Sequence, residues 1–377
     1  MMSYTRFETL LFIRNKRNLL LILLSLLFFT LYPFFFQLKE SIELREIKKQ
    51  ELMTVDNILM PFTSEYLALD EAYLKTYDNL VDQRQLIARQ LFNITSNKLE
   101  EFVENGYSLN ELRFQGIVDG FAGASKLFAF NQEDLLREQA LFTYLKEANM
   151  PIQTNNLTAV NAMTSSLQVY GSLLFFFVVL LISCDLFALD AEHRSILYSL
   201  PLSFWKKFHT KVGIMITMIM SSILVGVLVC FSVSSMLLEK GSFHYPVVFY
   251  TTEGYTAIPV WQYILLILSG FFIIGMFVVI GSSLGYFLFR QPYINLFVGS
   301  LCFFFPNILA MMHIPKVSSF IPMLYFKIPS ILDGELATQL WNFQMDFSRG
   351  MLVCVISIPF VFFLLVWARR RGIYHVS

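Results

Sequence analysis

Charged residues are scarce in this sequence. Asp, Glu, Lys and Arg make up 15% of its 377 residues, against about 25% in a typical soluble domain. Hydrophobic residues reach 56%, and they occur in runs long enough to cross a hydrocarbon core, which takes about 20 helical residues. The net charge of zero gives no overall field that would favour a nucleic-acid partner. The scarcity of charge therefore indicates an integral membrane protein and argues against an ordinary soluble domain.

Cysteine is absent from the longest polar stretch, residues 37–167. The four cysteines all lie in apolar runs, at Cys184, Cys230, Cys302 and Cys354. No disulfide framework is therefore available to the polar stretch. We expect the four thiols to behave as small apolar core residues.

Catalytic and ATP-binding motifs are missing as well. The chain has no GxxxxGK[ST] phosphate loop and no Gly-Lys dipeptide at all, and it lacks both HExxH and GxSxG. Its histidines are scattered, without a Cys/His cluster at metal-ligand spacing: His193, His209, His244, His313 and His375. We therefore predict a non-catalytic chain with no metal or cofactor of its own, and these absences disfavour an intramembrane enzyme.

Six apolar runs have the length of membrane-spanning helices. We expect these helices at 18–36, 168–189, 212–238, 261–289, 293–312 and 350–368. No small-residue cleavage site follows the first run, which is therefore predicted to be a retained span and not a signal peptide. The sequence thus predicts an all-α polytopic membrane protein with six transmembrane helices, the last five within residues 168–368.

The polar stretch 37–167 is predicted to be a mostly helical extracytoplasmic domain. It carries 19 Asp and Glu against 12 Lys and Arg. Its apolar residues recur at three- and four-residue steps, as at Leu80, Ile87 and Leu91, and no strand pattern is convincing. About 130 residues are enough for an independent core.

Lys and Arg are unevenly distributed among the segments that join the spans. If the N-terminus is cytoplasmic, twelve of them fall on the cytoplasmic side and four in the short outer loops. Since Lys and Arg accumulate in cytoplasmic loops, we expect both termini in the cytoplasm. Residues 369–377 would then form a basic cytoplasmic tail.

Residues 1–17 predict a short amphipathic cytoplasmic helix. Its apolar residues alternate with charged ones, among them Arg6, Arg14, Lys16 and Arg17. Such a helix can lie among the lipid headgroups, with its basic groups towards the phosphates. The other interpretation is a basic flank that only orients the first span.

The stretch between the second and third spans, residues 190–211, reads DAEHRSILYSLPLSFWKKFHTK. Asp190 opens it, a short apolar turn follows, Pro201 breaks it, and a basic aromatic run closes it. We predict a short helix on the membrane surface, with Trp205 towards an apolar surface and Lys206 and Lys207 towards phosphates or acidic partners. An ordinary interfacial loop with aromatic and basic anchors is the competing interpretation.

This stretch resembles the coupling element of ABC-2 type transporter permeases. In that family an acidic residue follows the second span, then come an apolar helix, a Leu-Pro-x-Ser step and a lysine that heads the third span. The matching positions are Glu192, Ser195, Leu200, Pro201, Ser203 and Lys211. The opening from Glu8, ETLLFIRNKRNLLLILL, is similar to the N-terminal pattern of the family. Many members have Gly-Thr where this chain has Arg194-Ser195, and an arginine at the position of Phe204, which leaves the register of the coupling helix open.

The resemblance implies a dimer of permeases, made with a second copy or a paralogue, in a bacterial plasma membrane. ATP and Mg²⁺ would be bound by a separate cytoplasmic ATPase subunit. The further coupling residues that it implies are Tyr198, Trp205, Lys206 and Lys207. Such permeases often have a re-entrant segment before the last span. The apolar stretch 313–331, interrupted by three prolines, suits such a segment, and an ordinary outer loop is the alternative.

Asp185 is the carboxylate placed about one turn inside the cytoplasmic end of the second span. A carboxylate costs about 2.5–3.5 kcal/mol at the centre of a span and less near its end. One interpretation makes Asp185, with Asp190, a pathway or coupling residue. The other is a carboxylate that reaches the interface and pairs with a neighbouring cation.

Two functional classes follow. The first is an ABC-2 permease subunit that exports a hydrophobic or amphipathic substrate, such as a peptide toxin or bacteriocin, an antimicrobial or a lipid. Overall length, the outer domain and the N-terminal opening are similar, at the level of topology, to permeases that serve streptolysin-type peptide toxins. The second is a membrane sensor or immunity protein whose acidic outer domain binds a ligand without transport.

Overall fold

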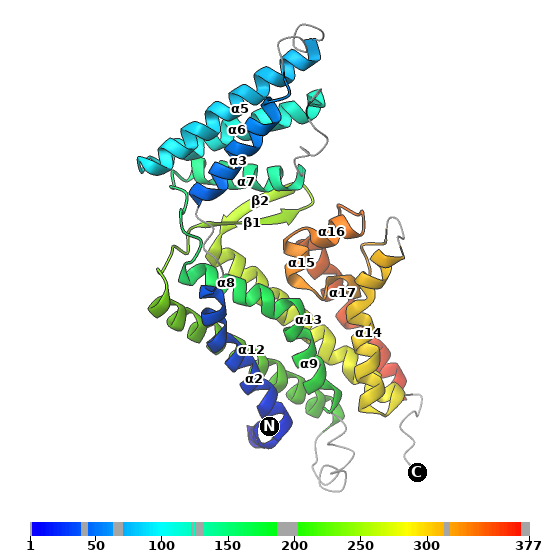
Figure 1. The fold of residues 1–377 in the computed structure, drawn as a ribbon. Helices are drawn as coiled ribbons and strands as arrows, with labels where there is room; N and C mark the ends of the chain where they lie inside the picture. Colours follow the sequence, from blue (N-terminus) through cyan, green and yellow to red (C-terminus); the bar gives the residue numbers. More distant parts are fainter. Residues whose placement is uncertain are drawn as a thin grey trace.

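The computed structural model describes residues 2–38, 44–62, 71–121, 124, 132–186, 203–312 and 317–370. Over these residues the chain is almost entirely helical and contains one two-stranded sheet. The helices form a bundle, and a separate group of helices lies beyond one of its ends (Figure 1).

Six helices in the described part of the chain are long and apolar enough to cross a membrane. The first is α2 (Lys16–Gln37). The second is the continuous run of α8 (Ala159–Val169), the π-helical η1 (Tyr170–Leu174) and α9 (Phe175–Cys184). The other four are α12 (Phe204–Leu237), α13 (Val260–Phe289), α14 (Pro292–Met311) and α17 (Phe347–Arg370). The prediction of an all-α polytopic membrane protein with six spans is confirmed.

Two of the helices begin well before the spans that the sequence predicts. The second span begins at Ala159 and not at residue 168, because Thr158 caps the helix by accepting a hydrogen bond from the backbone N–H of Asn161. The third span begins at Phe204 and not at residue 212, because its apolar residues keep a helical spacing through the basic run. The hydrogen-bonded backbone of a helix can extend beyond the apolar run that crosses the membrane. The boundaries of the helix and of the apolar run therefore need not coincide.

The bundle leaves large apolar side chains exposed around its circumference. On three of its helices they are Leu20, Leu23, Leu27 and Phe35 of α2, Tyr293, Phe297 and Met311 of α14, and Ile356, Phe360 and Phe363 of α17. Soluble proteins rarely expose contiguous apolar surface on this scale. The exposed belt suits contact with lipid chains.

The two ends of the bundle differ. One end, which we call the terminal face, carries α1 (Met2–Arg14), the beginning of α12 and the end of α17 (Figure 1). The opposite end, the domain face, carries the outer helices α3 (Leu44–Leu59), α5 (Glu71–Thr95), α6 (Leu99–Asp119) and α7 (Gln132–Glu147).

The outer helices form a domain with two small apolar cores. Phe102 and Phe142 join α6 to α7 in one core, and Ile87 and Leu109 join α5 to α6 in the other. Gly106 lets α6 and α7 approach closely, since a Cβ there would lie 2.6 Å from the Phe142 ring. The prediction of a mostly helical domain in this part of the chain is confirmed.

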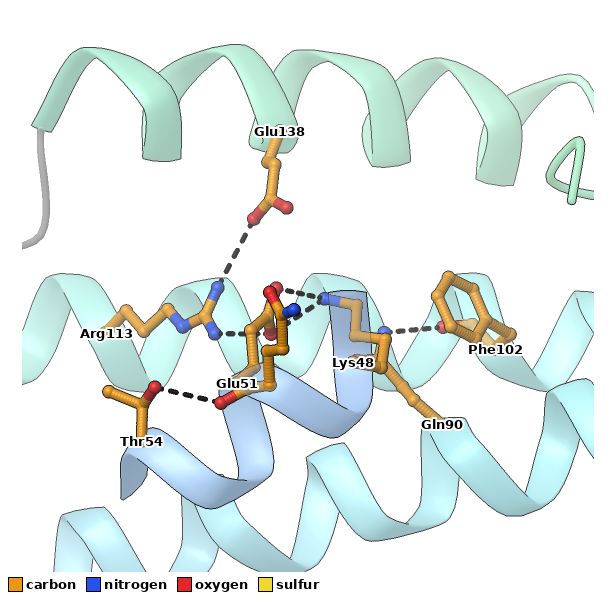
Figure 2. Close-up of polar contacts among 8 residues, drawn as sticks. Lys48, Glu51, Thr54, Gln90, Phe102, Arg113 and Glu138 are labelled. Carbon is orange, nitrogen blue, oxygen red and sulfur yellow. Dashed lines mark hydrogen bonds and ion pairs between the residues drawn. The ribbon is translucent and has the colours of Figure 1, made fainter. Parts of the chain in front are cut away.

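Charged groups are buried between the outer helices (Figure 2). Arg113 of α6, with 4% of its side chain exposed, donates to Glu51 of α3 at 2.9 Å and to Glu138 of α7 at 3.3 Å. Lys48, also buried, donates to Glu51 at 3.0 Å. Burial alone would raise the pKa of Glu51, but the charges and hydrogen bonds of Lys48 and Arg113 lower that pKa below its ordinary value. The network therefore ties three helices together through Arg113.

The hairpin of β1 (Pro246–Thr251) and β2 (Gly254–Pro259) lies between the outer domain and the bundle (Figure 1). Its strands are antiparallel, with Val248 opposite Ala257 and Thr251 opposite Gly254. Gly254 has φ +118°, a conformation that favours glycine. Our expectation was only a short outer loop here, although β-branched and aromatic residues in Pro246–Thr251 are typical of a strand.

The described part of the predicted re-entrant stretch, residues 317–331, consists of short elements. They are the 3₁₀-helix η2 (Pro322–Tyr325) and the beginning of α15 (Ile328–Leu332), and α16 (Glu335–Gln339) follows. Tyr325 and Ile328 are buried in the main apolar core. Broken backbone that is buried in protein is the packing that a re-entrant hairpin requires; residues 313–316 lie outside the described residues.

A polar contact joins the outer domain to this segment. The guanidinium of Arg137 in α7 donates to the backbone carbonyl of Asp333 at 2.6 Å and lies over the ring of Tyr255 in β2. Thr338 of α16 donates to Glu133 of α7 at 3.0 Å. Burial raises the pKa of the Asp333 carboxyl to about 6, although Arg137 acts in the opposite direction. The outer domain therefore contacts both the hairpin and the α15–α16 segment.

We expect Arg113→Ala to destabilise the outer domain by about 3 kcal/mol, because it leaves half-buried Glu51 without one of its two cations. The measurement is the thermal unfolding of the full chain in detergent, together with the rate of proteolysis between α3 and α7. Arg84→Ala is the matched control. Arg84 pairs with Asp56 on the surface of the same domain, and such a pair contributes at most about 1 kcal/mol. Equal effects of the two substitutions would contradict the role given to Arg113.

We expect the folded protein to lose stability as the pH rises, because Asp333 must ionise in a largely buried position. The folded protein holds the pKa of Asp333 at about 6, above its ordinary value of 3.8, so the folded state binds more protons between these values. The associated stability is complete below about pH 4 and is lost by about pH 6, up to about 3 kcal/mol.

Thermal unfolding of the full chain between pH 4 and pH 8 measures this loss. Asp333→Asn should abolish this loss of stability with rising pH. Glu335→Gln, which alters an exposed carboxylate nearby, should retain most of the loss. A pH slope that survives in Asp333→Asn would show that another group titrates.

Candidate functional site

The N-terminal helix α1 is fixed to the third span by a buried ion pair. Glu8 of α1 lies 3.5 Å from the ammonium of Lys211 in α12, and the two side chains are only 7% and 6% exposed. The hydroxyl of Tyr4 donates to the same carboxylate at 2.5 Å. A charge buried in this way is costly unless it stays paired, so the pair sets the position of α1 relative to α12.

A second ion pair joins the beginning of the first span to the end of the second. Asn15 separates α1 from α2, because its side chain caps α2 by accepting a hydrogen bond from the backbone N–H of Arg17. The guanidinium of Arg17 then pairs with Asp185, and it donates to the backbone carbonyl of Leu181 at 2.6 Å. Of the two interpretations of Asp185, the structure shows the pairing with a neighbouring cation.

The basic aromatic run, which we predicted to form a short separate helix on the membrane surface, lies in the first turns of α12. Ser203 precedes the first residue of the helix, and Trp205, Lys206, Lys207 and Lys211 belong to it. The apolar surface that Trp205 meets is the protein itself, since its ring lies 5.2 Å from that of Phe362 in α17. Lys206 is exposed, Lys207 is half-buried and Lys211 is buried.

Most of the stretch that carries the family resemblance lies outside the described residues. These positions are Asp190, Glu192, Ser195, Tyr198, Leu200 and Pro201. The basic side chains Arg6, Arg14 and Lys16 are exposed near the terminal face, on α1 and at the start of α2.

The two ion pairs have a joint consequence. Asp185 lies just before the segment 187–202, and Lys211 lies shortly after it. Both are bound to the N-terminal helices, Asp185 through Arg17 and Lys211 through Glu8. A displacement of the segment 187–202 would therefore act on α1, α2, α9 and α12 together.

A buried polar cluster joins the second, fourth and fifth spans. The amide of Asn295 in α14 donates to the backbone carbonyl and the hydroxyl of Ser282 in α13, at 2.8 and 2.9 Å. The Ser282 hydroxyl in turn lies 3.7 Å from the sulfur of Cys184. Gly285 makes room for Asn295, since a Cβ there would lie 2.1 Å from the amide oxygen.

Sequence reasoning missed this cluster and the partner of Glu8. The small residues at 281–285 carried a signal for close helix approach, but the partner helix could not be read from them. Glu8 and Lys211 each appeared in the family resemblance, at positions far apart in the chain. Only the fold brings their charges together.

Comparisons of the chain with protein-family models, with curated proteins and with solved structures find no match.

We expect Lys211→Met to release α1 from α12, because it leaves the carboxylate of Glu8 buried without a cation. Breaking a buried pair costs about 3–5 kcal/mol, so the rate of tryptic cleavage after the exposed Arg14 should rise about a hundredfold or more. Lys206→Met, an exposed position on the same helix, is the matched control and should leave that rate unchanged.

The charge swap Glu8→Lys with Lys211→Glu should restore much of the protection against trypsin, because it keeps opposite charges at the two positions. If trypsin cleaves the Lys211→Met variant at the same rate as the unmodified protein, the ion pair does not hold α1.

Proposed function

We propose that this chain is the permease subunit of an ABC-2 type transporter and exports a hydrophobic or amphipathic substrate with a separate ATPase subunit. The observation that carries the proposal is the double attachment of the N-terminal helices around the segment 187–202. This segment contains Glu192, Leu200 and Pro201, which resemble the coupling element of that family.

The linkage gives a physical route for coupling. An ATPase that pushes on the segment 187–202 would move the end of α9 and the beginning of α12 at once. Because Arg17 and Glu8 hold α2 and α1 to these two ends, the displacement would reach three spans. Movement of packed helices as rigid units is a common form of conformational switching.

The charge distribution supports the orientation that the proposal needs. The terminal face carries Arg6, Arg14, Lys16, Lys206 and Arg290 at exposed positions, and Lys and Arg accumulate on the cytoplasmic side of membrane proteins. An ATPase would thus meet the face where the segment 187–202 begins and ends. The acidic outer domain would lie on the opposite side, next to the exit of the pathway.

A second copy or a paralogue would complete the transporter. The helices α2, α14 and α17 leave most of their apolar surface outside the core, with 28%, 17% and 28% of their most apolar stretch buried. Part of this surface would pack against the second permease and the rest against lipid.

The test is photocrosslinking in native membranes, with the photoreactive residue at Tyr198 or at exposed Lys206. We expect an adduct with an ATPase subunit from both positions. A photoreactive residue at Lys240, an exposed position at the other end of α12, is the control and should give no such adduct. Absence of an ATPase from both terminal-face positions would contradict the proposal.

Transport in proteoliposomes with the captured ATPase distinguishes a permease from a sensor. We expect ATP-dependent movement of substrate that Glu192→Ala abolishes. A ligand that protects the outer domain from proteolysis, without any ATP-dependent transport, would instead support the alternative of a membrane sensor or immunity protein.

A further inference from the structure

A cleft of about 400 Å³ opens between α1 and α12 at the terminal face. It is lined by Thr5 and Thr9 of α1 and by six residues of α12, namely His209, Thr210, Gly213, Ile214, Thr217 and Met218. Its volume is within the range of about 300–1,000 Å³ that is usual for small-molecule sites. Neither Glu8 nor Lys211 is among the residues that line the cleft.

The side chains that line the cleft leave few hydrogen-bonding groups for a ligand to satisfy. The hydroxyls of Thr9, Thr210 and Thr217 each donate to a backbone carbonyl of their own helix, at 2.8 to 2.9 Å. Gly213 is open, since a Cβ there would meet nothing within 4 Å. Together with Ile214 and Met218, these residues form a surface against which an alkyl chain can pack without leaving a polar group unsatisfied.

Two exposed basic side chains, Arg6 and Lys206, are near neighbours in sequence of residues that line the cleft. Lys206, which is exposed, lies one turn before Thr210 on the same face of α12, and His209 itself lines the cleft. Arg6 is exposed next to Thr5. No Asp or Glu is among the lining residues, and nearby Glu8 is already paired with Lys211. The cleft thus suits a ligand with an anionic head and an apolar tail.

The position of the cleft matches the depth at which such a ligand lies in a bilayer. From His209 to Met218 the axis of α12 rises about 13 Å, from the basic end of the span into its apolar part. On α1, Phe7, Leu10 and Leu11 are exposed, as expected for a helix that lies in the headgroup layer. The cleft therefore extends from the basic end of α12 into the apolar part of the span.

We propose that this cleft binds one anionic phospholipid, with its phosphate at Lys206 and His209 and an acyl chain along Gly213 and Met218. The bound lipid would fill the space between α1 and α12. This inference does not depend on the transport function.

The test is native mass spectrometry of the full chain in mild detergent, titrated with phosphatidylglycerol and, separately, with phosphatidylcholine. We expect tighter binding of phosphatidylglycerol. Gly213→Leu should weaken it at least tenfold, because the new side chain occupies the cleft. Gly281→Leu is the matched control, since a Cβ at Gly281 also meets nothing within 4 Å and lies on another span. It should bind phosphatidylglycerol as the unmodified protein does.

The headgroup is tested with Lys206→Gln. We expect about fivefold weaker binding of phosphatidylglycerol, which corresponds to about 1 kcal/mol for one charge near the membrane, and unchanged binding of phosphatidylcholine. Tryptic cleavage after Arg14 at the unmodified rate verifies that α1 stays in place in each variant.

Three results would overturn the proposal. The first is full retention of phosphatidylglycerol in Gly213→Leu. The second is equal binding of the two lipids, or complete displacement of phosphatidylglycerol by soluble glycerol phosphate, which would point to an anion site without a lipid chain. The third is a photoreactive residue at Thr217 that crosslinks to a second copy of the chain and not to lipid.

Discussion

The terminal face depends on one buried ion pair, that of Glu8 with Lys211. Two charges that are removed from water must stay together, since either charge left alone would cost several kcal/mol. This requirement fixes the amphipathic helix α1 against α12, and the cap at Asn15 then fixes the direction in which α2 leaves. The pairing of Arg17 with Asp185 follows from that direction and closes the connection to the second span.

The opposite end of the molecule is organised by the same physical rule. The outer helices bury only small apolar cores, and Arg113 supplies a charged centre that holds α3, α6 and α7. Arg137 then fastens this domain to Asp333 and Tyr255. Movement of the bundle would therefore reach the outer domain through these polar contacts and through the packing of α7 on the hairpin.

Much of the architecture could be predicted from hydropathy alone. The six spans were expected in the right order, because a helix that crosses lipid needs a long apolar run and little else. Their boundaries were less predictable. Phe204–Lys211 is helical although it is basic, and Ala159–Val169 is helical although it precedes the most apolar part of its span. The hairpin at Pro246–Pro259 was missed, although its β-branched and aromatic residues are typical of a strand, because the segment is a short connection between two spans.

The sequence by itself determined the class of protein, the number of spans and the charge bias between the two sides, because these are properties of local composition. Only the tertiary structure decided which charges meet. Glu8 and Lys211, Arg17 and Asp185, and Arg113 and Glu51 are each far apart in the chain, and a charge has no local pattern that names its partner. The cleft between α1 and α12 is likewise a property of two packed helices, and neither helix alone contains it.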